Sequence, residues 1–167
     1  MIVINAQSYE RMKNKIVSNK FLYNAIKIMY KVLPLVIFLA YPLLVAYLIF
    51  NWDTRYIRVI FVPIGVYIAI TIMRIIVNRP RPYEKEGISP LFPKSTKGKS
   101  FPSRHCGSAF IIAFAFWYIS IGLGIPCMII ATIISLLRPV AGVHYISDIL
   151  GAVAISSLFG ILFFFIF

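Results

Sequence analysis

The stretch AFIIAFAFWYISIGLGIPCMIIATIISLL, residues 109–137, has no charged side chain in 29 positions. An α-helix rises 1.5 Å per residue, so about 20 apolar residues are enough to cross a bilayer. The stretch is therefore too long for a single span. The glycines and the proline of 122–126 (GLGIP) offer a break within it. We predict one membrane span near 103–121 and another near 125–138.

Composition supports a membrane protein. Hydrophobic residues make up 60% of the 167-residue chain and charged residues only 13%. An ordinary soluble domain is about half apolar and a quarter charged. A chain of this size has too little interior to hide the surplus, because its surface is large relative to its volume. Composition therefore excludes a soluble monomer and a disordered chain, and the lipid bilayer is the predicted environment.

Three further segments are apolar enough to span: 32–50, 57–77 and 146–167. Together with the two above they give about five spans, so we predict an all-α, polytopic transmembrane helix bundle forming a single domain over 1–167. The N-terminal segment 1–31 mixes lysines with apolar side chains at mostly helical spacing. That pattern predicts an amphipathic helix lying at the membrane interface.

The charge balance is strongly basic, with 17 Lys and Arg against 5 Asp and Glu and a net charge of +12. In a soluble protein this would suggest nucleic acid. Here the charges cluster beside apolar tracts, which favours anchoring to anionic lipid, and we expect no nucleic-acid partner. Cys106 and Cys127 have no paired spacing. They are interpreted as small buried side chains, with no metal site.

The number of spans fixes which loops share a membrane surface. With five spans, segments 74–105 and 138–148 both face the side that holds the N-terminus. The first contains the polar loop 78–102, with five prolines and several basic residues. We therefore expect this loop to face the connection between the last two spans.

Both histidines of the chain, His105 and His144, fall on this surface. The only charged residues after position 105, Arg138 and Asp148, fall there too. Ionisable groups beside hydrocarbon cost about 2.5–3.5 kcal/mol on insertion scales, so they are usually paired or functional. An Arg138–Asp148 ion pair would explain two of the four residues and would leave the histidines unexplained.

The spacing of His144 and Asp148, four residues apart, places both on one face of a helix. A carboxylate there accepts a hydrogen bond from one imidazole nitrogen and leaves the other basic. Arginines present forked donors that match phosphate oxygens. The set suggests an anionic, tetrahedral substrate, with one histidine attacking and the other protonating the leaving group.

Three motifs carry a family resemblance: Arg74-x6-Arg81-Pro82, Pro102-Ser103-Arg104-His105 and Arg138-x5-His144-x3-Asp148. They resemble K-x6-R-P, P-S-G-H and S-R-x5-H-x3-D of the type 2 phosphatidic acid phosphatase superfamily of membrane lipid phosphatases. The motifs extend over residues 74–148, and the surrounding helices extend the likeness to most of the chain after about residue 32. Together the three are specific, whereas any one alone would be weak.

The resemblance implies a role for each matching residue. His144 would attack phosphorus and become a phosphohistidine, with Asp148 orienting it. His105 would protonate the leaving oxygen and then activate water. The resemblance implies neither metal nor cofactor, because arginines would stabilise the transition-state charge. Substrate binding would fall to the remaining matching residues: Arg74, Arg81, Ser103, Arg104 and Arg138.

The chain departs from the family pattern at three positions. Arg74 replaces lysine, Arg104 replaces glycine and Leu137 replaces serine. For Arg104, a substrate contact and a solvated loop charge are equally open. Arg79 lies between motif positions and is expected to be a solvated or headgroup-binding charge. The three lysines of 94–99 are expected to form a flexible basic rim that attracts anionic lipid.

The expected function is that of a metal-independent lipid phosphatase acting on a phosphate monoester or diphosphate of a membrane lipid. Undecaprenyl diphosphate is slightly favoured over phosphatidylglycerophosphate, phosphatidate and lipid A phosphate, because small bacterial members of the family often act on it. A non-enzymatic anion- or lipid-binding or transport protein, and a lipid phosphotransferase, remain alternatives. Partners other than the substrate and the bilayer, and the oligomeric state, stay open.

The expected location is a bacterial inner membrane, and the side that the site faces stays open. The basic N-terminal segment places that side in the cytoplasm by the positive-inside rule. The family resemblance places it outside, since many bacterial members face outward.

Overall fold

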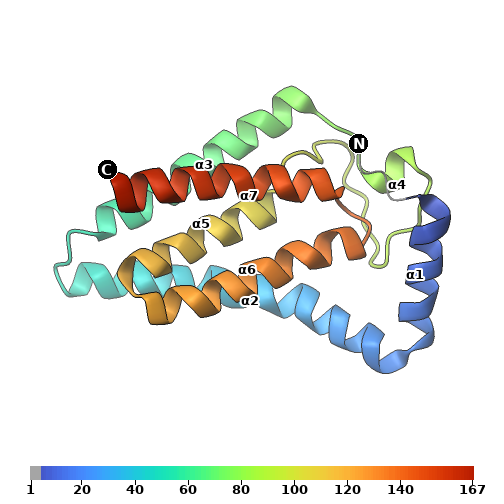
Figure 1. The fold of residues 1–167 in the computed structure, drawn as a ribbon, viewed down its shortest axis with the longest axis horizontal. Helices are drawn as coiled ribbons and strands as arrows, with labels where there is room; N and C mark the ends of the chain where they lie inside the picture. The colour runs from blue at the N-terminus through green and yellow to red at the C-terminus, as the bar shows by residue number, and fades with distance from the viewer. Residues whose placement is uncertain (1–4) are drawn as a thin grey trace.

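The computed structural model describes residues 5–167, which are helical with no strand. A bundle of long helices runs along the molecule, and shorter elements cover one of its ends (Figure 1). The elements are α1 (Ala6–Ser18), α2 (Lys20–Phe50), α3 (Tyr56–Val77), α4 (Pro82–Lys85), α5 (Arg104–Ile119), α6 (Ile121–Val140), α7 (Ile146–Ile161) and a closing π-helical turn (Leu162–Ile166). The predicted all-α bundle is confirmed.

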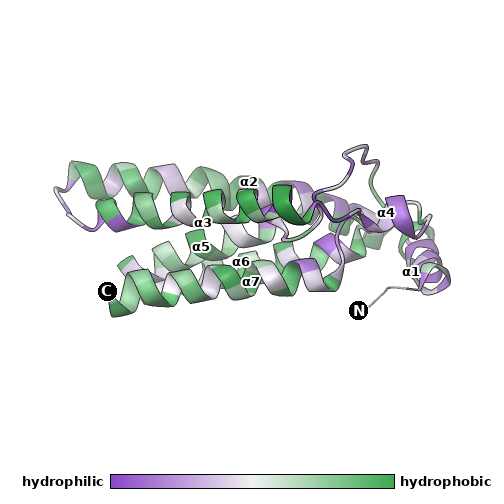
Figure 2. Cartoon of the chain, turned by 90° about the horizontal axis from the view of Figure 1, so that it is seen from above, coloured by the Kyte–Doolittle hydropathy of each residue, from purple (hydrophilic) through white to green (hydrophobic). Residues whose placement is uncertain are grey.

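Four helical segments are long and apolar enough to cross a membrane: α2, α3, α6, and α7 together with the π-helical turn that continues it to Ile166. The fifth long helix, α5, has only 16 residues. It packs against all four of the others, and half of its residues are buried. Sixteen residues rise about 24 Å, which is short of the hydrocarbon thickness, so α5 is the predicted span that does not reach full membrane length as a helix. Apolar residues dominate the bundle, and hydrophilic ones gather at its two ends (Figure 2).

The break within the long apolar stretch lies earlier than predicted. It falls at Ser120, whose backbone is extended at φ −156° and ψ 129°, and α6 begins with the next residue. Gly124 is helical and serves packing: a Cβ there would lie 2.4 Å from the Cα of Trp117. The GLGIP segment therefore lets α6 approach α5 closely instead of separating the two helices.

The prediction of one amphipathic helix over 1–31 is wrong in part. Residues 1–4 lie outside the described residues, and α1 ends at Ser18. The side chain of Asn19 then caps α2 by accepting a hydrogen bond from the Leu22 amide at 3.0 Å. Asparagine is a preferred helix cap, so the chain turns there and residues 20–31 become the first turns of α2. Helix α2 continues to Phe50 through two prolines.

The two segments expected to face each other do so. The Leu91 amide donates to the carbonyl of Ala141 at 3.1 Å, and the Ser103 amide donates to that of Asp148 at 3.0 Å. Helices α1 and α4 lie at this same end of the bundle, opposite the C-terminus (Figure 1). The predicted meeting of these two segments at one end of the bundle is therefore confirmed.

Helix α1 contacts both of these segments through Tyr9, which is 1% exposed. The Tyr9 hydroxyl accepts a hydrogen bond from the Leu91 amide at 3.1 Å, and burial raises the pKa of Tyr9 to about 12. Gly142 lies against the same hydroxyl with φ +73°, and a Cβ there would come within 2.4 Å of it. Beside it, Glu10 accepts from the Ser89 amide at 3.1 Å. Helix α1 thus fixes the loop and the turn relative to each other.

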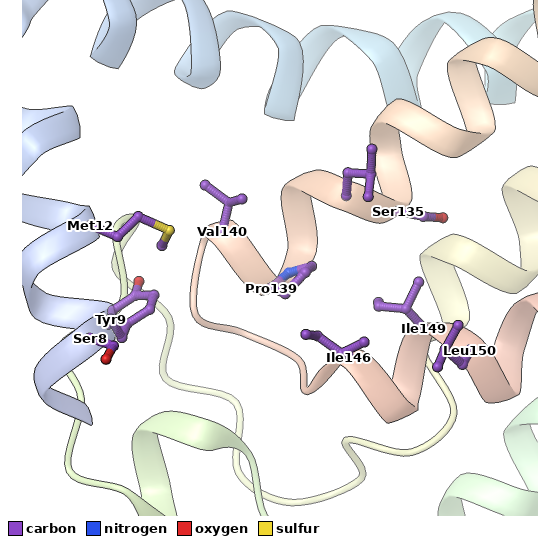
Figure 3. A pocket seen from close by; sticks show the side chains of 10 residues that line it. Ser8, Tyr9, Met12, Ser135, Pro139, Val140, Ile146, Ile149 and Leu150 are labelled. Atoms are coloured by element: carbon purple, nitrogen blue, oxygen red, sulfur yellow. The ribbon is translucent and has the colours of Figure 1, made fainter. Parts of the chain in front are cut away.

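A hollow of about 520 Å³ separates α1 from the ends of α6 and α7 (Figure 3). Apolar side chains dominate its wall, among them Met12, Val140, Ile146 and Leu150. Such a lining suits hydrocarbon and offers little to an anion. The charged residues of the predicted site lie elsewhere.

Candidate active site

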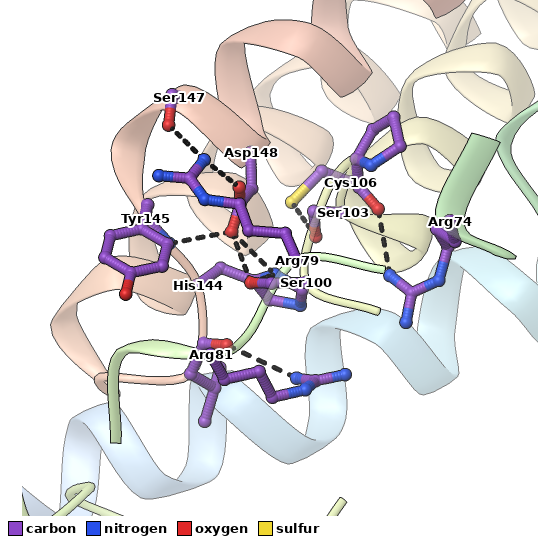
Figure 4. Close-up of polar contacts among 12 residues, drawn as sticks. Arg74, Arg79, Arg81, Ser100, Ser103, Cys106, His144, Tyr145, Ser147 and Asp148 are labelled. Atoms are coloured by element: carbon purple, nitrogen blue, oxygen red, sulfur yellow. Dashed lines mark hydrogen bonds and ion pairs between the residues drawn. The ribbon is translucent and has the colours of Figure 1, made fainter. Parts of the chain in front are cut away.

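His144 lies in the turn between α6 and α7 and is 4% exposed. Its Nδ1 lies 3.4 Å from Oδ2 of Asp148, which is fully buried in the first turn of α7. The same carboxylate oxygen accepts hydrogen bonds from the Tyr145 amide at 2.9 Å and the Ser100 hydroxyl at 2.5 Å (Figure 4). The carboxylate is thus held at the Nδ1 side of the ring, which leaves Nε2 for the cavity described below.

Arg79 completes the surroundings of Asp148. Its Nη1 forms an ion pair with Oδ1 of Asp148 at 2.8 Å and donates to the hydroxyl of Ser147 at 2.7 Å. Its guanidinium stacks 4.1 Å from the ring centre of Tyr145. The expectation of a solvated or headgroup-binding charge at Arg79 is therefore wrong. The ion pair of Asp148 is made with Arg79 and not with Arg138.

A cavity of about 110 Å³ opens beside His144. The cavity is small and its wall is mostly polar and cationic, as suits a phosphoryl group. Both histidines and four of the five predicted substrate-binding residues line it. The lining residues are Tyr30, Arg74, Arg81, Lys94, Thr96, Arg104, His105, Arg138, Val143 and His144.

Arg74 and Arg81 are buried and are oriented by loop carbonyls. Arg74, in the last turn of α3, donates from Nη1 to the carbonyl of Pro102 at 2.9 Å. Arg81 donates from Nε to Gly98 at 3.1 Å and from Nη1 to Val143 at 3.3 Å. A guanidinium carries five N–H donors, so each arginine keeps donors free for an anion.

Arg138, in the last turn of α6, is 5% exposed, and its Cζ lies 4.5 Å from the ring centre of Tyr30. Within the described part of the chain its buried Nε has no hydrogen-bond partner. Leaving a buried donor unpaired costs about 1–3 kcal/mol. An anion in the cavity would remove that cost.

Arg104 and His105 are the first two residues of α5, so the positive end of that helix meets the cavity. Arg104 donates to the hydroxyl of Tyr67 at 3.2 Å, which draws its side chain along the cavity wall. The ring of His105 is 6.4 Å from that of Phe38 on α2. Both residues therefore stand between the cavity and the apolar faces of α2 and α3.

Ser103 is the predicted binding residue that does not line the cavity. It is fully buried, and its hydroxyl donates to the sulfur of Cys106 at 3.1 Å. Its backbone amide, bonded to the carbonyl of Asp148, joins α5 to α7. In this structure Ser103 is thus a link between helices.

Burial lowers the pKa of His144 from its usual 6.5 to about 4, and the nearby charges of Arg81 and Arg74 act in the same direction. The ring is therefore neutral at pH 7. A neutral imidazole with Nδ1 facing a carboxylate has its lone pair on Nε2, as a nucleophile requires.

Several residues at the site had no sequence signal. Ser100, Tyr30 and Thr96 belong to no motif, and Lys94 was expected only in a basic rim.

No three His, Cys, Asp or Glu side chains of residues 5–167 cluster as metal ligands would. The groups available to bind a ligand are arginines, a lysine and two imidazoles. Fold and site together define a membrane-embedded helix bundle with a small cationic cavity at one end.

The family model of the PAP2 superfamily matches residues 55–167, and the chain belongs to this superfamily. LpxE of Aquifex aeolicus has a similar structure, with a TM-score of 0.71 and 21% identity over 95% of this chain and 93% of that one. The first transmembrane PAP2-type phosphatidylglycerolphosphate phosphatase from Bacillus subtilis gives 0.66 and 18%, over 93% and 82%. No curated protein sequence matches the chain significantly. Superfamily and fold together support a membrane lipid phosphatase.

Proposed function

We propose that the protein hydrolyses a phosphate monoester or diphosphate of a membrane lipid through a phosphohistidine at His144. The observation that carries the proposal is the meeting of His144 and His105 with four arginines around one cavity of about 110 Å³. Asp148 stands behind His144, 3.4 Å from its Nδ1. Together these residues supply a nucleophile, a carboxylate that orients it, a general acid and an anion-binding site.

In the first step the Nε2 lone pair of His144 forms a bond to phosphorus. The phosphorus–oxygen bond to the lipid breaks, and its electron pair stays on the leaving oxygen. Once a phosphate occupies the cavity, its negative charge favours the protonated form of His105, which donates its proton to that oxygen and becomes neutral. Asp148 keeps the proton on Nδ1 of His144 and balances the positive charge that develops on the ring.

In the second step neutral His105 accepts a proton from a water molecule as its oxygen attacks phosphorus. The nitrogen–phosphorus bond breaks, and its electron pair returns to His144. Inorganic phosphate leaves, and His105 is protonated again for the next cycle. Arg74, Arg81 and Arg138 stabilise the charge of the phosphoryl oxygens in both steps, so the mechanism needs no metal ion.

The hydrocarbon part of the substrate has a place beside the cavity. A groove of about 400 Å³ between α2, α3 and α5 is lined mainly by apolar side chains, including Phe38, Tyr67 and Ile111. Phe38 lies against His105, and Tyr67 accepts a hydrogen bond from Arg104. A lipid chain in this groove would have its head at the arginines, which supports entry from the side of the bundle.

The substrates to test are undecaprenyl diphosphate, phosphatidylglycerophosphate, phosphatidate and lipid A phosphate, with location in a bacterial inner membrane as part of the proposal. The experiment is release of inorganic phosphate by purified protein in neutral detergent micelles, with His144→Ala as control. The proposal expects release by the wild type alone. Stoichiometric lipid binding without release would favour a binding or transport protein, and a product that requires an added alcohol would favour a phosphotransferase.

A further inference from the structure

A second hollow, of about 370 Å³, opens beside the phosphoryl cavity. One wall is α2, with Lys27, Tyr30 and Lys31, and the other is the loop segment 92–94. Tyr30 and Lys94 belong to the lining of both spaces. The cavity and the hollow are therefore adjacent, with Tyr30 and Lys94 at their common border.

The walls of the hollow are fixed by packing. The Phe92 ring lies 4.9 Å from the Tyr30 ring and 6.0 Å from the Tyr23 ring, centre to centre. The next residue back, Leu91, is buried in an apolar cluster with Ile26 of α2. Tyr30 is held from the other side by the guanidinium of Arg138. The hollow is thus a formed recess between α2 and the loop.

The charge of the hollow is positive and uncompensated. Lys27, Lys31 and Lys94 line it, and none of the three forms an ion pair with any residue from 5 to 167. Lys27 and Lys31 are four apart on one helix, where like charges destabilise each other. An anion between them would relieve that repulsion.

We propose that this hollow is a subsite for a second phosphate of the same lipid, so that the enzyme prefers lipids with two phosphates to lipids with one. The proposal rests on the function proposed above and narrows its substrate class. The terminal phosphoryl group would occupy the arginine cavity, and the second phosphate, a few bonds away, would meet the lysines. The headgroup phosphate of a neighbouring anionic lipid has the same chemistry and is the other source of such a ligand.

The test compares phosphatidylglycerophosphate, which has two phosphates, with phosphatidate of the same acyl chains, which has one, in neutral detergent micelles. The variant is the double substitution Lys27→Ala with Lys31→Ala. The matched control is Lys15→Ala with Lys20→Ala, which removes the same charge from exposed positions outside the hollow. We expect the ratio of kcat/KM for the two lipids to fall five- to tenfold in the variant, mainly through KM, and to stay constant in the control.

Two results would overturn the subsite, and a third would overturn the proposed function on which it rests. An equal loss for both lipids would mean that the lysines only attract anionic surfaces. If adding phosphatidylglycerol to the micelles lowered KM for phosphatidate in the wild type and not in the variant, the hollow would take a neighbouring lipid. Absence of phosphate release from either lipid by the wild type would contradict the proposed function itself, whereas a constant ratio with active protein would contradict the subsite alone.

Discussion

Nη1 of Arg79 lies 2.8 Å from Oδ1 of Asp148, an ion pair that joins the loop after α3 to the first turn of α7. Arg79 does not line the phosphoryl cavity, so it acts on the reaction only through the carboxylate. The carboxylate in turn faces Nδ1 of His144. Arg79 is thus a positioning residue for the proposed nucleophile.

We predict that Arg79→Ala lowers kcat at least about tenfold, equivalent to about 1.4 kcal/mol in the barrier, and changes KM little. The reason is that Asp148 loses its ion partner and no longer holds His144 in one orientation. Steady-state kinetics on one lipid substrate gives both constants, and Arg79→Lys should recover part of kcat. A rise in KM with normal kcat would instead assign Arg79 to substrate binding.

The second prediction concerns pH. Because burial lowers the pKa of His144 to about 4, its neutral, nucleophilic form persists well below the usual 6.5. In a plot of kcat/KM against pH, the acidic side that reports protonation of His144 in the free enzyme should therefore fall only as the pH approaches 4. The plot is first corrected for the titration of the substrate phosphate. A pH profile from 4 to 8 measures it. A His144 limb centred near 6.5 would contradict the buried, cationic surroundings.

The third prediction concerns the contact between α1 and the turn before His144. Gly142→Ala should lower both Tm and kcat, because its Cβ would come within 2.4 Å of the Tyr9 hydroxyl at φ +73°. The positive φ alone costs about 1 kcal/mol. In a Tyr9→Ala background the steric part disappears, so the same substitution should cost less. Thermal unfolding of the four proteins measures this coupling, and additive effects would refute the contact.

The fourth prediction concerns metal ions. If the arginines and His105 supply all the charge stabilisation and proton transfer, phosphate release should continue at full rate in excess chelator. The measurement compares initial rates with chelator alone and with added Mg²⁺. A strict requirement for Mg²⁺ would count heavily against the mechanism proposed above.

The bundle could be predicted from the sequence because uncharged runs of membrane length leave a chain few alternatives. The meeting of segments 74–105 and 138–148 followed from the number of spans alone. The helix boundaries were harder, because they depend on local capping and packing. Asn19 caps α2, and Gly124 packs on Trp117. The pattern of apolar residues along the sequence shows neither the cap nor the packing contact, so it placed both boundaries further along the chain.

The cavity residues were predictable where they belong to motifs of fixed spacing. Arg79 and Ser100 were not, because both lie in an irregular loop whose path sets where a side chain points. Their contacts with Asp148 needed the folded loop. Ser103 shows the reverse: it belongs to a motif, yet its hydroxyl is bonded to Cys106 away from the cavity.

The most direct measurement of the central claim is to trap the covalent intermediate. Wild-type protein would be mixed with a lipid phosphate, quenched in alkali within one turnover and digested for mass spectrometry. The account predicts phosphate on the peptide carrying His144, none on the corresponding peptide of His144→Ala, and no turnover by that variant. Phosphate release at a near-normal rate by His144→Ala, or a phosphorylated residue other than His144 in the wild type, would contradict it.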